Sequence, residues 1–200
     1  MSKLVPAIDP EGLLEYSVVF TDRSLNHMSQ TFQQVMRDIS GTLKDVYNAN
    51  AVAVVPGGGT FGMEAVARQF AQDKKCLVIR NGWFSYRWSQ IFEMGGIPAS
   101  ETVLKARQLG DREQPQFAPA AIEDVVAEIR ASKPDVVFAP HVETAAGIIL
   151  PDAYVTALAE AAHEVGALLA LDGTEGHVSV LRSRGCRGCP RDQTSAASRP

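Results

Sequence analysis

The 200-residue sequence lacks the features that mark exported, membrane-bound and nucleic-acid-binding proteins. Its three cysteines are too few for a disulfide framework. No run of about eighteen uncharged apolar residues occurs, and the N-terminus lacks a basic run followed by an apolar one, so we expect neither membrane insertion nor export. A formal net charge of -4 gives no general attraction to nucleic acid or anionic lipid. These absences favour a cytoplasmic protein with a small-molecule ligand.

The sequence is 46% hydrophobic, enough for one α/β core at this length. Segments with helical spacing alternate with short β-branched runs. The expected helices are 29–47, 63–71, 84–94, 120–131 and 151–165, and the expected strands are 51–55, 76–79, 102–104, 136–138 and 167–171. This alternation predicts an α/β fold, a mostly parallel sheet with helices on both faces, in which ligands bind beyond the carboxyl ends of the strands.

Three further segments have predicted properties. Apolar residues three and four apart over 29–47 predict a helix with one buried face. The polar, proline-containing stretch Leu109–Pro119 is expected to be an exposed loop. Residues 181–200 contain five arginines, one leucine and no valine, isoleucine or aromatic residue, so we expect a disordered tail after a domain over 1–180.

A glycine-rich segment, Gly57–Gly62, connects the expected strand 51–55 to the next helix. Backbone N–H groups and the positive helix end favour an anion there, with the Thr60 hydroxyl as an added donor, so a phosphate is the expected ligand. The alternative is a tight turn needed only for packing. The segment also fits G-x-G-x-x-G, and Arg80 could meet a 2′-phosphate, so an NADP-binding Rossmann domain stays open. About fifty residues precede this strand, which is unusual for that fold.

Aromatic residues follow the expected strand 76–79. The segment Asn81–Arg87 places Trp83, Phe84 and Tyr86 beyond its carboxyl end, where a ring can stack on a flat heteroaromatic ligand. The alternative is that Trp83, Phe84 and Trp88 pack under a helix.

Two polar residues follow other expected strands. Thr144, in His141–Gly147, could hydrogen-bond a ligand or cap a turn. Asp172 ends the most apolar strand, where a carboxylate is unfavourable without a partner such as a protonated ring nitrogen. The alternative for Asp172 is a turn or N-cap residue. We expect no metal site, because the histidines have no partner at ligand spacing and Cys186-x-x-Cys189 is a single pair.

Four segments, taken with their order and spacing, resemble the class V aminotransferases, nearest to the alanine/serine–glyoxylate group. They are Gly57–Glu64, Asn81–Arg87, His141–Gly147 and Gly166–Asp172. The resemblance covers roughly residues 15 to 173. It implies part of the large domain of fold-type I pyridoxal-phosphate enzymes, a homodimer, and transfer of an amino group between a small amino acid such as alanine or serine and a 2-oxo acid such as glyoxylate.

The resemblance also implies roles for individual residues. Gly58, Gly59 and Thr60 would hold the cofactor phosphate, and Phe84 would stack on its ring. Thr144 matches the hydroxyl residue of the family's H-x-E-[ST] motif. Asp172 matches the aspartate that keeps the pyridine nitrogen protonated.

The sequence departs from the family pattern directly after Asp172. The family continues to a Q-K pair whose lysine forms the Schiff base with the cofactor, whereas all six lysines here precede Asp172. The smaller C-terminal domain with the substrate-carboxylate arginine has no counterpart either. A reading-frame change or an incomplete gene model would produce this pattern, and we expect the chain alone to be inactive. Alternatives are a non-catalytic remnant that binds a ligand or another subunit, and an NADP-dependent oxidoreductase domain.

Overall fold

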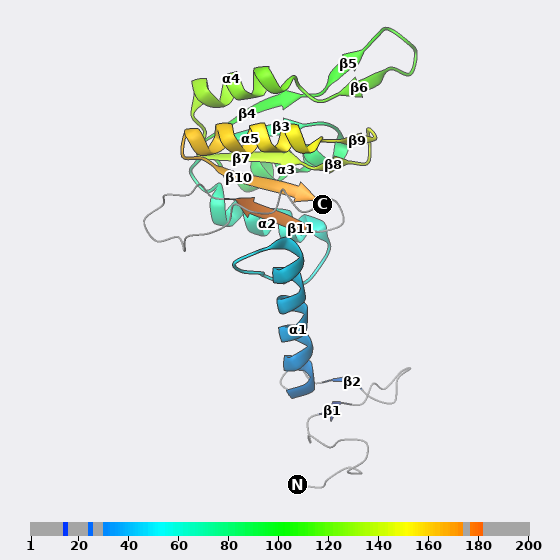
Figure 1. Ribbon diagram of the computed structural model, residues 1–200, viewed down its shortest axis with the longest axis vertical. Coiled ribbons are helices and arrows are strands. Elements are labelled where there is room, and N and C mark those ends of the chain that lie inside the picture. The colour runs from blue at the N-terminus through cyan, green and yellow to red at the C-terminus, as the bar shows by residue number, and fades with distance from the viewer. Residues whose placement is uncertain (1–13, 16–23, 26–29, 174–176, 182–200) are drawn as a thin grey trace. The chain divides into compact units, whose positions relative to one another are not determined.

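The structure is a computed structural model that describes residues 14–15, 24–25, 30–173 and 177–181. The described residues divide into two compact units, one before Val55 and one from Val55 onward (Figure 1). The predicted organisation, a domain over 1–180 and a disordered tail over 181–200, stays a prediction. Apart from Leu181, the tail lies outside the described residues.

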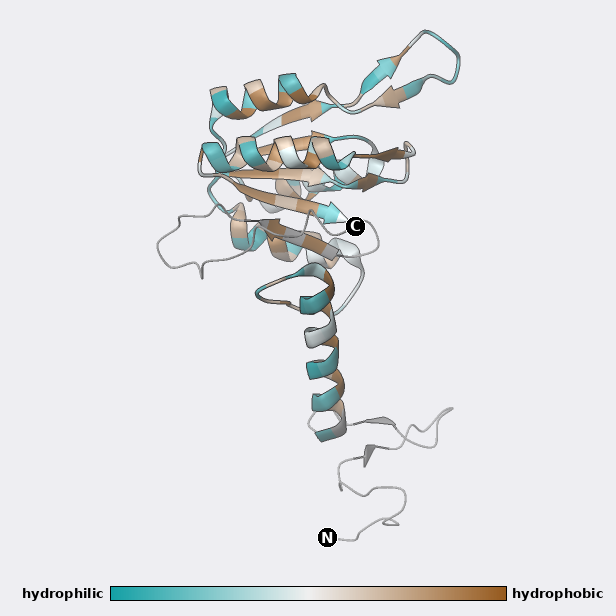
Figure 2. Cartoon of the chain, in the orientation of Figure 1, coloured by the Kyte–Doolittle hydropathy of each residue, from teal (hydrophilic) through white to brown (hydrophobic). Residues whose placement is uncertain are grey.

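The first unit contains one long helix, α1 (Gln30–Tyr47), and the antiparallel pair β1 (Leu14–Glu15) and β2 (Ser24–Leu25). The helix confirms the prediction for 29–47, but its predicted buried face is wrong. Val35, Ile39 and Val46 are 42%, 40% and 68% exposed, and apolar residues run along the helix in Figure 2. Helical spacing predicts an amphipathic helix but not whether a surface exists to cover it.

The second unit alternates strands and helices, as predicted. Its helices are α2 (Gly59–Phe70), α3 (Trp83–Gly95), α4 (Ile122–Ser132) and α5 (Asp152–Glu164). Its strands are β3 (Lys75–Arg80), β4 (Ser100–Lys105), β5 (Arg107–Leu109), β6 (Gln116–Ala118), β7 (Val136–Pro140), β8 (Val142–Glu143), β9 (Ile148–Ile149), β10 (Leu168–Gly173) and β11 (His177–Leu181).

The central sheet has the strand order β11-β10-β7-β3-β4. The four strands from β10 to β4 are parallel, and β11 pairs antiparallel with β10 at the edge. The carboxyl ends of β3, β4, β7 and β10 therefore meet at one side of the sheet. This confirms the predicted fold class, although β11 was not predicted.

Alternate residues of the strands face two separate hydrophobic clusters. Leu77 and Ile79 of β3 pack with α4 and α5, whereas Cys76 and Val78 pack with α2 and α3. Strands that are buried on both faces read as continuous apolar runs, which is how β3, β7 and β10 appear in the sequence. Helices thus cover both faces, as predicted.

Two predicted segments differ from the structure. Ala51–Val55 is not a strand, and Val54 and Val55 are 52% and 40% exposed. A β-branched run favours an extended chain, but a strand needs a partner, and none of the described strands pairs with this segment. Leu109–Pro119 is exposed as predicted but is not only a loop, because it contains β6 and the last residue of β5, which pair as an antiparallel hairpin.

Candidate active site

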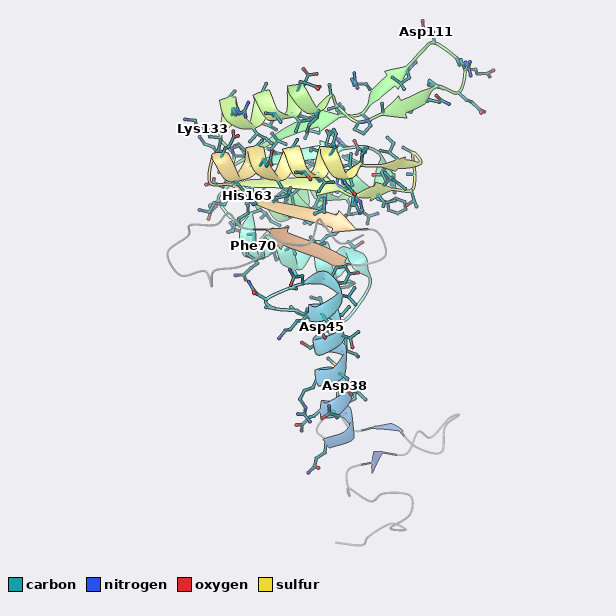
Figure 3. The ribbon with its side chains drawn as sticks, in the orientation of Figure 1. Asp38, Asp45, Phe70, Asp111, Lys133 and His163 are labelled. Carbon is teal, nitrogen blue, oxygen red and sulfur yellow. The ribbon has the colours of Figure 1, made fainter. Side chains whose placement is uncertain are left out.

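The starts of the helices lie at the carboxyl ends of the parallel strands. In Figure 3, Phe70, Lys133 and His163, which lie at or beside the C-terminal ends of α2, α4 and α5, share one side of the view. The arrowheads of β4 and β10 point to the opposite side in Figure 1. The first turn of α2 and the carboxyl ends of the strands therefore share a side, where the predicted site residues lie.

The glycine segment begins α2. Gly58 is the N-cap residue, no side chain caps the helix, and Gly59 and Thr60 already belong to its exposed first turn, so α2 starts four residues before the prediction. The Phe61 N–H donates to the Gly58 carbonyl at 2.9 Å. Gly57 has φ +123°, and a Cβ there would lie 2.8 Å from the Phe61 ring, so this position requires glycine. An uncapped, exposed helix start suits an anion.

The aromatic residues in the first half of α3 differ in their exposure to solvent. Trp83 and Phe84 are 58% and 49% exposed. Trp88 is fully buried, with its ring centroid 4.6 Å from that of Phe138. The packing interpretation is therefore correct for Trp88, whereas the Phe84 ring is open to solvent at the ligand side of the sheet.

Asp172 lies in β10 opposite Pro140 of β7, and its carbonyl oxygen accepts the His141 N–H at 2.7 Å. Burial raises the pKa of its carboxyl group to about 6, and the nearby Glu143 carboxylate adds to this rise. Burial and a like charge both disfavour the ionised form, and a cationic partner would reverse this. Asp172 thus has the environment expected of a carboxylate that receives a protonated group.

Thr144 lies in the turn between β8 and β9. It is exposed, and its carbonyl oxygen accepts the Gly147 N–H at 3.4 Å, where Gly147 has φ +64°. The main chain thus closes the turn. A ligand contact by the Thr144 hydroxyl stays a prediction.

Glu143 is a site residue that the sequence analysis missed. It is fully buried, and one carboxylate oxygen, Oε1, accepts the Phe84 N–H at 3.1 Å. The other, Oε2, accepts the Ser85 N–H at 2.9 Å and the Ser85 hydroxyl at 2.6 Å. Glu143 therefore joins the end of β8 to the start of α3. The available signal was a carboxylate three residues after the apolar strand β7.

Gly82 leaves the space that Glu143 occupies. A Cβ at Gly82 would lie 2.7 Å from both Cγ and Cδ of Glu143. Gly82→Ala is therefore expected to lower the free energy of unfolding by about 1–3 kcal/mol, because the buried carboxylate must shift away from its donors. Urea unfolding measures the change.

Gly62→Ala is the matched control for Gly82→Ala. Gly62 lies inside α2, and a Cβ there would meet nothing within 4 Å. This variant should be neutral or stabilised by up to about 1 kcal/mol, because alanine favours helix over glycine. Equal stability changes in the two variants would contradict the close approach of Glu143 to Gly82.

The family model for aminotransferase class V matches residues 13–180 of the sequence. The chain belongs to the aminotransferase class V family. None of the curated proteins compared with the sequence matches it.

Solved structures share the fold of this class V chain. Ureidoglycine–glyoxylate aminotransferase from Bacillus subtilis is 20% identical, with a TM-score of 0.58 over 76% of this chain and 44% of that one. Alanine–glyoxylate aminotransferase from Nostoc sp. is 21% identical, with a TM-score of 0.56 over 74% and 36%. Aspartate aminotransferase from Thermus thermophilus is 25% identical, with a TM-score of 0.58 over 74% and 39%. The class V chain thus spans less than half the length of each.

Two kinds of feature are absent from the described part of the class V chain. None of its helices is long and apolar enough to cross a membrane. Among the same residues, no group of three or more histidine, cysteine, aspartate or glutamate side chains is placed to hold a metal ion.

Proposed function

We propose that this chain forms the cofactor-holding part of a pyridoxal-phosphate-dependent aminotransferase. The observation that carries the proposal is the environment of Asp172, a half-buried carboxylate at the carboxyl end of β10 whose pKa is raised by burial and by the charge of another carboxylate, Glu143. Neither group has a cationic partner in the ion pairs of the described residues, which join only Arg68 with Glu64 and Arg130 with Glu164. A protonated pyridine nitrogen would supply the missing positive charge.

The donors and surfaces around Asp172 suit the rest of the cofactor. The uncapped first turn of α2 offers the N–H groups of Gly59 and Thr60, and the Thr60 hydroxyl, to a phosphate. Phe84 offers an exposed ring face to a flat heteroaromatic group. Pyridoxal phosphate, when bound, supplies an electron-withdrawing ring that carries the amino group between substrates.

Each group has a distinct task in this proposal. Gly58–Thr60 bind the phosphate and fix one end of the cofactor. Phe84 covers one face of the ring and excludes water from it. Asp172, in its ionised form, holds the proton on the pyridine nitrogen, and the Thr144 hydroxyl donates a hydrogen bond near the ring.

The proposed substrates are a small amino acid such as alanine or serine and a 2-oxo acid such as glyoxylate. Support comes from the family and from the names of two fold relatives, which act on glyoxylate. A homodimer and a cytoplasmic location stay predictions from the resemblance and the composition.

The lysines of the second unit do not suit a covalent link to this cofactor. Lys74, Lys75 and Lys133 lie at the amino ends of strands, on the opposite side of the sheet from Asp172. Lys105 ends β4, which β3 and β7 separate from β10. Three strand spacings amount to about 14 Å, farther than a lysine side chain extends. A non-catalytic, ligand-binding chain is therefore the second candidate function.

The proposal predicts that the chain binds pyridoxal phosphate without a covalent bond. Binding should appear as a change in cofactor absorbance and be competed by inorganic phosphate, because phosphate occupies the same helix start. Borohydride reduction followed by mass spectrometry should find no labelled lysine. One fully labelled lysine would contradict the assignment of the site, and tight NADPH binding without pyridoxal phosphate binding would favour the Rossmann alternative.

A further inference from the structure

The buried hydrogen bonds at the start of α3 converge on Glu143. The N–H groups of Asn81 and Gly82 donate to the Ser85 hydroxyl oxygen at 2.9 and 3.1 Å. With both acceptor positions of that oxygen in use, its proton is free to be donated, and the shortest contact is to Glu143 Oε2 at 2.6 Å. That distance is typical of a hydroxyl that donates to an ionised carboxylate.

This arrangement makes Glu143 the cap of α3. The first turn of α3 contains no acidic residue of its own. Glu143 supplies the carboxylate from β8 and accepts the Phe84 and Ser85 N–H groups, two of the donors that a helix start leaves unpaired. The helix dipole further stabilises a negative charge at that end. The fully buried carboxylate of Glu143 thus has hydrogen-bond donors at both of its oxygens.

The Glu143 carboxylate also affects the ionisation of the Asp172 carboxyl group. Strand β8 follows β7, which pairs with β10, so Glu143 and Asp172 both lie at the carboxyl side of the sheet. The negative charge of Glu143 adds to the rise in the pKa of Asp172. Phe84 and Asp172 are two of the predicted contacts to the cofactor ring, and Glu143 influences both without touching the ring itself.

We propose that Glu143 is a positioning residue of the cofactor site, which anchors the backbone of Phe84 and places a negative charge beside Asp172. This inference rests on the proposed function where it gives Glu143 a role in the cofactor site. The anchoring and the charge effect are properties of the chain itself and can be measured without a cofactor.

The test compares Glu143→Gln with the wild-type chain. The Phe84 and Ser85 N–H groups donate to different oxygens of the Glu143 carboxylate, and in the glutamine side chain of this variant an NH2 donor replaces one of those oxygens. Hydrogen exchange at those two amides should rise at least about tenfold relative to amides in the centre of α3. The pKa of Asp172, followed by carboxyl-carbon NMR in the absence of ligand, should shift down from about 6 because the like charge is gone.

A conservative variant separates the two effects. Glu143→Asp keeps the charge but shortens the reach, so exchange at Phe84 and Ser85 should rise while the pKa of Asp172 stays high. If Glu143→Gln fails to fold, the same two measurements on Glu143→Asp still test whether Glu143 anchors the Phe84 backbone and affects Asp172. Glu160→Gln, an exposed position on α5, is the control and should change neither readout.

Two outcomes would overturn the inference. One is a Glu143→Gln chain whose free energy of unfolding falls while the titration of Asp172 and the exchange at Phe84 are unchanged, which would leave Glu143 a packing residue. The other is a Glu143→Asp chain that loses the raised pKa of Asp172. If pyridoxal phosphate does not bind the wild-type chain, the proposed function fails, and these two cofactor-free readouts still decide the role of Glu143. If it does bind, Glu143→Gln should weaken binding by about tenfold.

Discussion

The Asp172→Asn variant is expected to be more stable than the wild-type chain at pH 7.5 and about equally stable near pH 4. The pKa of Asp172 is raised from 3.8 to about 6 in the folded chain. A raised carboxyl pKa contributes stability that is present in full below the unfolded value of 3.8 and is lost as the pH rises through about 6. Asparagine has no proton to lose, so the difference at pH 7.5 should be about 3 kcal/mol.

Urea unfolding at pH 4 and pH 7.5 measures this difference. Asp111→Asn is the matched control, because Asp111 is exposed in the turn of the β5–β6 hairpin (Figure 3). The control should follow the pH dependence of the wild-type chain. An Asp172→Asn chain that also follows the wild-type dependence would show that Asp172 is not held in an unfavourable environment.

The same substitution should weaken binding of pyridoxal phosphate, by at least about tenfold at pH 7.5, because the ring nitrogen loses its ionic partner. The wild-type chain should itself bind more weakly at pH 5, where Asp172 is largely protonated, than at pH 7.5. Opposite effects of one substitution on stability and on binding are expected where a fold keeps a strained group for function. A gain in stability without a loss of binding would assign Asp172 to the fold alone.

Hydrophobic periodicity was sufficient to predict the parallel strands β3, β4, β7 and β10 and the helices between them. Runs such as Val136–Phe138 are apolar on both faces, and an intervening helix requires a parallel connection, so strand and helix positions follow from local sequence. The position of Asp172 was predicted on the same basis. A polar residue directly after a buried strand must lie at the carboxyl side of a parallel sheet.

The missed features depend on partners that local sequence does not specify. Glu143 acquires its role because β3 and β7 are neighbours in the sheet, which brings it to Phe84 and Ser85 across 59 and 58 residues of chain. The failure at Ala51–Val55 has the same origin, since a β-branched run forms a strand only beside another strand. Helix α1 adds a third case, in which the apolar spacing predicted the helix but not the exposure of Val35, Ile39 and Val46.

The Phe138→Ala variant is expected to lose about 3–5 kcal/mol of stability, the largest loss among the substitutions considered. Phe138 is fully buried in β7, and its ring centroid lies 4.6 Å from that of Trp88 and 5.1 Å from that of Phe92. Both partners belong to α3, so this cluster holds α3 on the sheet. Chemical unfolding gives the magnitude. Phe117→Ala, on the exposed hairpin, should change stability by less than about 1 kcal/mol.

The cavity left by Phe138→Ala should also change the pattern of hydrogen exchange along α3. Glu143 fixes that end of the helix and the aromatic cluster fixes its middle, so loosening the middle should raise hydrogen exchange along α3 while Phe84 and Ser85 stay the slower amides. Glu143→Gln predicts the reverse pattern, with fast exchange confined to the first turn. If Phe138→Ala instead released the first turn before the middle, Trp88 and Phe92 rather than Glu143 would be what places Phe84 at the site.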